Sequence, residues 1–304
     1  MNLPSSEQTT SESISGAVFG AAAFLIWGIS PLYWKLLMSV PALEIVSHRV
    51  VWSFFFLMPL IPLRNRLSDF FAVIKSRRSM TILVTTSLLV SCNWLVYIWA
   101  INNGHLLQAS LGYYINPLVN VLLGTVFLRE RLRQFQAYAV LLAGAGVLYL
   151  TIGYGQFPWI ACVLAFSFGF YGLIRKVIDV GSLVGLTVET MLLTIPAMGY
   201  LFYLGDKGMG AFWSGQFQVD GLLAGTSVVT AAPLLLFAMS ARRVRLTTLG
   251  FLQYIAPSCM FLMAIFVFQE PFRLQQLISF ILIWTALALY SIDSAVHFRD
   301  TSPG

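Results

Sequence analysis

Long apolar runs separated by short polar segments dominate the chain. Each run is about as long as the ~20 residues that cross the hydrocarbon core of a bilayer. The ten runs cover residues 15–38, 42–62, 80–101, 107–128, 135–151, 158–174, 182–203, 221–240, 246–268 and 274–291. A helix satisfies its backbone polar groups internally, which a lipid environment requires. The pattern therefore predicts an all-α membrane protein with ten transmembrane helices.

The composition agrees with a lipid environment. Hydrophobic residues make up 58% of the 304 residues and charged residues 10%, and the mean hydropathy is +0.81. Soluble domains carry roughly 25% charged residues. The net charge of +6 comes from short loops between the runs, so we expect membrane lipid as a partner and no nucleic acid. The three cysteines lie far apart inside apolar runs, so no metal site is expected.

The basic residues divide unequally between the two sides of the predicted membrane. With a cytoplasmic N-terminus, fourteen of the 18 lie on the inner side, Lys35, Lys207 and Arg273 lie on the outer side, and Arg49 lies within a span. Cytoplasmic loops of membrane proteins are enriched in Lys and Arg. We therefore predict a multi-pass protein of a bacterial-type inner (plasma) membrane with both termini cytoplasmic. Residues 1–13 are polar and lack the basic start of a secretory signal, so the first run is expected to remain as a helix.

The second half of the chain repeats the first. A shift of 141 along the sequence places Gly28 on Gly169 and Lys35 on Lys176. A shift of 140 aligns Tyr114 with Tyr254, Pro117 with Pro257, Glu130 with Glu270, Arg133 with Arg273 and Gln136 with Gln276. Each repeat holds five spans, an odd number, so the second begins from the opposite face of the membrane. The predicted organisation is a polar tail (1–13), two inverted five-helix repeats (14–151 and 155–292) and a cytoplasmic tail (293–304).

Inverted repeats are typical of secondary transporters, which bind solutes near the midplane between the repeats. Two similar packings, each open to one side, would permit alternating access. The alternative is a polytopic membrane protein that is not a transporter, either a membrane enzyme or a structural subunit. The chain has no HExxH, GxSxG or Walker A motif, so we expect neither an enzyme nor a cofactor.

Polar residues inside the spans are candidates for a solute site, because they are costly in lipid. Tyr113, Asn116 and Asn120 recur on one helical face beside Pro117. The further candidates are Trp27, Asn93, Tyr97, Tyr171 and Gln253. Together they predict an aromatic, amide-rich and uncharged lining that suits a neutral, zwitterionic or aromatic small molecule. The alternative for each residue is a hydrogen bond across a helix pair.

Ionisable residues form a second group. Glu44 and His48 lie near the outer face, Glu189 lies near the inner face, and the shift of 141 maps His48 onto Glu189. Two titratable groups in matching places suggest coupling to protons. The alternative is local pairing of Glu44 with His48, with Glu189 held by a neighbouring helix.

Two acidic residues end helices at opposite faces of the predicted membrane. Glu130 and Glu270 are each followed by an arginine at the third position, which predicts interfacial clamps. With the paired prolines Pro117 and Pro257, they complete the candidate coupling and gating residues.

Four segments together resemble a known family. They are WGISPLYWK (27–35), HRVVWS (48–53), NWLVYIWAINNGHLLQASLGYYINPL (93–118) and QYIAPSCMFLMAIFVFQEPF (253–272). They are similar to the RarD branch of the EamA, drug/metabolite transporter superfamily, and the resemblance runs from about residue 14 to residue 292. It implies ten transmembrane helices in two EamA-type repeats and secondary transport of small metabolites or drugs through a central cavity. It does not supply the physiological solute.

Overall fold

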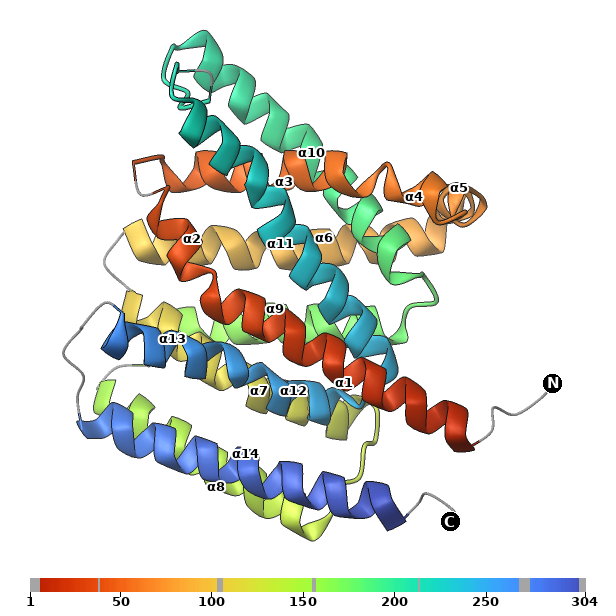
Figure 1. Cartoon of the computed structure of the whole chain (residues 1–304), viewed down its shortest axis with the longest axis vertical. Coiled ribbons are helices and arrows are strands. Elements are labelled where there is room, and N and C mark those ends of the chain that lie inside the picture. Colours follow the sequence, from red (N-terminus) through yellow and green to blue (C-terminus); the bar gives the residue numbers. More distant parts are fainter. Residues whose placement is uncertain are drawn as a thin grey trace.

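The protein is an array of long helices (Figure 1), seen in a computed structural model that describes residues 6–37, 39–102, 106–154, 157–212, 214–267 and 274–300. The longer helices are α1 (Ser6–Ile29), α3 (Ala42–Leu57), α6 (Arg77–Asn102), α7 (Leu106–Phe127), α8 (Gln134–Tyr154), α9 (Trp159–Val177), α10 (Ser182–Asp206), α11 (Phe217–Arg243), α13 (Ile255–Phe266) and α14 (Leu274–Asp300). The short ones are α2 (Pro31–Lys35), α4 (Leu60–Leu63), α5 (Leu67–Lys75) and α12 (Leu246–Gln253).

Seven of the described helical stretches are long and apolar enough to cross a membrane. Two more apolar stretches, Leu111–Phe127 and Leu277–Asp293, are shorter. The chain is therefore an all-helical membrane protein, as the apolar runs predict.

Three of the predicted helices are interrupted. The first divides at Ser30, because Pro31 has no N–H to donate to the Trp27 carbonyl, and Ser30 donates its hydroxyl hydrogen to that carbonyl at 2.8 Å instead. The second divides between α3 and α4, at Met58 and Pro59. The ninth divides at Tyr254, between α12 and α13. The apolar pattern continues through all three breaks, so it does not locate them.

The order of the helices follows the internal repeat. The shift of 140 carries the start of α6 at Arg77 onto the start of α11 at Phe217, and it aligns α7 with α12 and α13, and α8 with α14. The neighbours correspond as well. Helix α1 packs against α11, α12 and α13, and α9 packs against α6 and α7, while α3 pairs with α10 and α8 with α14.

Two equivalent glycines allow equivalent helices to approach closely. A Cβ on Gly28 (α1) would lie 2.7 Å from the Cβ of Cys259 (α13), and a Cβ on Gly169 (α9) would lie 2.7 Å from Cγ1 of Val119 (α7). The shift of 140 places Val119 on Cys259, just as the shift of 141 places Gly28 on Gly169. The same helix crossing therefore occurs in each half.

The basic loops gather at one end of the array, the end where α1 begins and α14 finishes (Figure 1). Arg133 pairs with Asp293 of α14, with Nε 2.8 Å from Oδ2. Lys176 donates to the carbonyl oxygens of Ala241 (3.3 Å) and Val244 at the C-terminus of α11. The negative end of the helix dipole favours a cation there. We call this end, marked by Arg133 and Lys176, the basic end.

Candidate functional site

The arginine of α3 lies where five helices converge. The Arg49 guanidinium carbon is 4.8 Å from the centre of the Trp34 ring (α2) and 5.0 Å from that of the Trp94 ring (α6). Its Nε donates to Thr230 Oγ1 (α11) at 2.9 Å. Within the described ranges, no acidic side chain forms an ion pair with Arg49. The guanidinium is therefore held by aromatic faces and one hydroxyl.

Tyr97 (α6) and Tyr113 (α7) complete the surroundings of Arg49. Their rings meet edge to face with centres 5.9 Å apart, their hydroxyl groups are hydrogen-bonded, and both lie close enough to interact with the charge of Arg49. We call the set Trp34, Arg49, Trp94, Tyr97, Tyr113 and Thr230 the Arg49 cage. Its aromatic members and Arg49 are only partly buried, although they lie within or next to predicted spans.

The structure adds a charge beside the predicted uncharged lining. That lining contained Tyr97 and Tyr113 but not Arg49, which the structure puts beside both tyrosines. The sequence carried a signal, because an arginine inside an apolar run is costly and is usually functional.

Three of the predicted amide residues also come together. Asn120 (α7) donates from Nδ2 to Gln253 Oε1 (α12) at 2.7 Å and to Asn116 Oδ1 at 3.4 Å. All three side chains are buried. Because Asn116 lies one turn from Tyr113 on the same face of α7, this amide cluster adjoins the Arg49 cage.

Asn93 and Trp27 lie in other contacts. Asn93 donates from Nδ2 to the Leu164 carbonyl (2.8 Å) and to Ser167 Oγ (3.0 Å), both in α9, which matches the alternative of a bond across a helix pair. The Trp27 ring lies 5.7 Å from that of Phe168 and 5.9 Å from that of Phe237. We call Trp27, Phe168 and Phe237 the aromatic layer.

Tyr171 belongs to a buried polar cluster on the other side of the aromatic layer. Its ring stacks on Phe237, and its hydroxyl donates to Glu189 Oε2 at 3.2 Å. Thr86 donates to Glu189 Oε1 at 2.6 Å, and Arg175 lies 3.7 Å from the same oxygen. Tyr171, Glu189 and Arg175 are buried almost completely. The interior is therefore tightly packed at this level.

Glu44 and His48 lie at the start of α3, far from the basic end. Glu44 Oε1 accepts a hydrogen bond from the Ala211 amide at 2.6 Å and lies 4.0 Å from His48 Nε2. The His48 ring packs 5.0 Å from that of Phe212. The alternative to proton coupling was that Glu44 pairs with His48 and that a neighbouring helix holds Glu189. The contacts of these three residues are of that kind.

Glu130 joins the end of α7 to the start of α12. Its carboxylate accepts hydrogen bonds from the backbone amides of Leu246 (2.7 Å) and Thr247 (3.0 Å), where the positive end of a helix favours an anion. The expected partner Arg133 pairs with Asp293 instead. The clamp thus uses backbone amides, and the corresponding Glu270 lies outside the described residues.

The prolines differ in their surroundings. Pro117 lies inside α7, and its carbonyl oxygen would be only 2.6 Å from a Cβ on Gly250 of α12. Pro257 lies in the first turn of α13. An N–H group at this position has no acceptor within the helix, so the proline costs no helical hydrogen bond.

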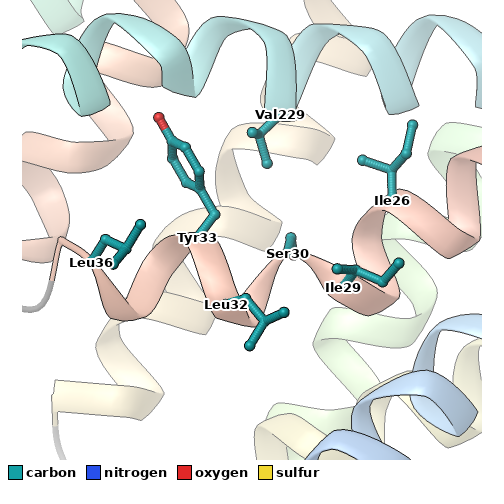
Figure 2. Close-up of a pocket in the computed structure, with 7 residues that line it drawn as sticks. All are labelled: Ile26, Ile29, Ser30, Leu32, Tyr33, Leu36 and Val229. Carbon is teal, nitrogen blue, oxygen red and sulfur yellow. The ribbon is translucent and has the colours of Figure 1, made fainter.

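A pocket of about 450 Å³ lies between α1–α2 and α11 (Figure 2). Its lining residues are Ile26, Ile29, Ser30, Leu32, Tyr33, Leu36 and Val229. Ile29, Leu32 and Leu36 are exposed, as expected of a surface that meets lipid chains. The pocket contains none of the predicted site residues, and we do not assign the solute to it.

The fold and the polar interior together define a polytopic membrane protein of the transporter type. The EamA-like transporter family matches residues 14–152. A Vibrio cholerae protein named "Uncharacterized transporter" is 48% identical over 278 residues, which cover 91% of this chain and 92% of that protein. Protein RarD of Escherichia coli is 44% identical over 287 residues, covering 94% and 97%.

The chain therefore belongs to the EamA-like transporter family, with RarD proteins among its relatives. This confirms the resemblance seen in the sequence, and a transporter family also confirms that the chain is not an enzyme. One solved crystal structure has the same fold, with a TM-score of 0.71 at 17% identity over 91% of this chain and 98% of that one.

Proposed function

We propose that the protein is a secondary transporter that moves a small organic solute across a bacterial-type inner membrane by alternating access. Two inverted five-helix repeats, 14–151 and 155–292, would supply the two packings. The starts of α6 and α11, which the shift of 140 relates, and the matched contacts of Gly28 and Gly169 support this architecture.

The observation that carries the proposal is a difference in packing along the interior. The Arg49 cage is partly exposed, whereas Tyr171, Glu189 and Phe237, toward the basic end, are buried almost completely. A site that is accessible on one side and closed on the other is what alternating access requires of each end state. Tyr97, Tyr113, Trp27 and the Asn116–Asn120–Gln253 amide cluster would contact the solute. Asn93 and Tyr171 would join them when their present hydrogen bonds exchange.

The basic end would face the cytoplasm, with both termini. The fourteen-to-three division of the loop charges supports this orientation. Coupling to protons through His48 or Glu189 is part of the proposal. Both residues are buried and titratable, and they hold equivalent places in the two halves.

The test is solute flux through the purified full chain in proteoliposomes. A panel of radiolabelled organic acids, their amides and amino acids is offered on one side. We expect saturable counterflow of at least one member above protein-free vesicles. If folded protein gives no saturable flux of any member, the proposed function is wrong.

A further inference from the structure

We infer that the Arg49 cage binds the carboxylate of an organic acid whose remaining body is aromatic or apolar. The inference rests on the proposed function, because it names the class of solute that the transporter would move. The Arg49 guanidinium lies within a span and among aromatic rings.

A charge within a span is costly unless it is paired or solvated. Arg49 gains from the faces of Trp34 and Trp94 and from Thr230, but in the described parts of the chain it has no carboxylate partner. The buried arginine of the second half differs, because Arg175 lies 3.7 Å from Glu189. Arg175 thus has an anionic partner within the protein. An anionic solute would be the corresponding partner of Arg49.

The geometry around the guanidinium favours a carboxylate. The guanidinium carbon lies over the Trp34 and Trp94 rings, and Thr230 takes the Nε–H. The remaining N–H groups lie in one plane, as a fork that matches the two oxygens of a carboxylate. The hydrogen bond between Tyr97 and Tyr113 uses one of their two hydroxyl hydrogens, so one further donor is left beside the guanidinium.

The rest of the cage indicates what the acid carries. Four aromatic side chains, Trp34, Trp94, Tyr97 and Tyr113, offer stacking surfaces to an aromatic or apolar body. Arg49 is the only cation in the set of residues that defines the cage, and one positive charge matches a monoanion better than a phosphate dianion.

The first experiment measures the electrostatic potential of the cage without any solute. Tyr113→Cys is made in the full chain after Cys92, Cys162 and Cys259 are replaced by serine. The introduced thiol is treated with a sulfonate-bearing and with a quaternary-ammonium-bearing methanethiosulfonate. We expect Arg49→Gln to lower the ratio of anionic to cationic reaction rates about tenfold, as the loss of a nearby charge at intermediate dielectric would.

The matched control is Lys207→Gln, which removes an exposed cation from a loop. It should leave the rate ratio unchanged. A ratio that Arg49→Gln does not alter, or a thiol that neither reagent reaches, overturns the inference.

The second experiment identifies the ligand class. Tryptophan fluorescence of the full chain in nanodiscs is titrated with phenylacetate, 3-phenylpropionate and hexanoate, each beside its neutral amide. We expect the acids to act at concentrations at least about tenfold lower than the amides, because the amides lack the charge. The difference should vanish in Arg49→Gln and shrink in Arg49→Lys, which keeps the charge but loses the fork. Equal responses to acids and amides in the wild type, including no response to either, overturn the inference.

The two proposals fail separately. Acid-selective binding without saturable flux would refute transport and leave the carboxylate site standing. Saturable flux of amides that is the same in Arg49→Gln would support transport and refute the carboxylate site.

Discussion

Asn120 and Gln253 connect the two halves of the protein directly, since the Nδ2 of Asn120 donates to the Oε1 of Gln253 over 2.7 Å in a buried position. The bond joins α7 to α12, which the shift of 140 aligns in the sequence. We expect Gln253→Leu to destabilise the protein by about 0.6–1.7 kcal/mol, the range for hydrogen bonds between membrane helices. Unfolding in mixed micelles measures this. Thr125→Val is the control, because the Thr125 hydroxyl donates within α7, to the Leu122 carbonyl. Equal effects of the two substitutions would contradict the prediction.

The close crossing at Gly28 gives a second stability prediction. Gly28→Ala places a methyl group 2.7 Å from the Cβ of Cys259, and overpacking of this kind costs about 1–3 kcal/mol. Gly144→Ala is the control, because its added Cβ has no atom of another described helix within 4 Å. Cys259→Gly in the same chain should recover most of the loss. A thermal midpoint of Gly28→Ala that equals that of Gly144→Ala would show that the helices separate freely.

The orientation of the protein can be measured with reporter fusions. A reporter that is active only in the periplasm is fused to the C-terminus, and another is inserted in the loop at residues 206–213. The loop fusion should be active and the C-terminal fusion silent, because the basic loops favour the cytoplasm. The reverse pattern would refute the assignment of the basic end.

Thiol labelling tests the proposed solute path. In a chain without its native cysteines, single replacements at Asn93, Tyr97, Tyr113, Asn116 and Gln253 are treated with a water-soluble maleimide. Tyr97→Cys and Tyr113→Cys should react fastest, because these side chains are partly exposed while Asn116 and Gln253 are buried.

Leu88→Cys is the control, since Leu88 is exposed on the apolar face of α6 and should meet lipid rather than water. If positions 97 and 113 react no faster than position 88, the water-filled path lies elsewhere.

Proton coupling predicts that flux follows an imposed pH gradient in proteoliposomes. Glu189→Gln keeps the shape of the side chain but cannot ionise, and His48→Ala removes the imidazole. At least one of the two variants should lose the gradient dependence while it keeps exchange of solute at equal pH. Wild-type flux that ignores the gradient, or two variants that both respond as the wild type does, would end this part of the proposal.

The helices and some members of the site could be predicted from the sequence. How the side chains of the site come together could not. Apolar runs predict spans because lipid imposes one rule on every helix. Tyr97 and Tyr113 were both candidates for the lining, and their rings meet in the structure. The position of Arg49 between Trp34 and Trp94 depends on packing among helices far apart in the sequence.

Glu130 gives the same lesson at the membrane surface. The sequence offers Arg133 as a partner, yet the carboxylate binds backbone amides of the other half of the chain. Any residue type can present such amides, so the side-chain pattern does not reveal them.

The break at Tyr254 makes the two halves mechanically unequal. Helix α12 is fastened to the first half at both ends, by Glu130 at its start and by Asn120 at Gln253. Helix α13 packs against α1 and is 12 residues long, a lever of about 18 Å at 1.5 Å per residue. Its counterpart α7 runs through Pro117 as a single rod. In a rocking motion at the end opposite the basic end, the chain would therefore bend at Tyr254. Helices α13 and α1 would move together, while the contact between α7 and α12 stays fixed.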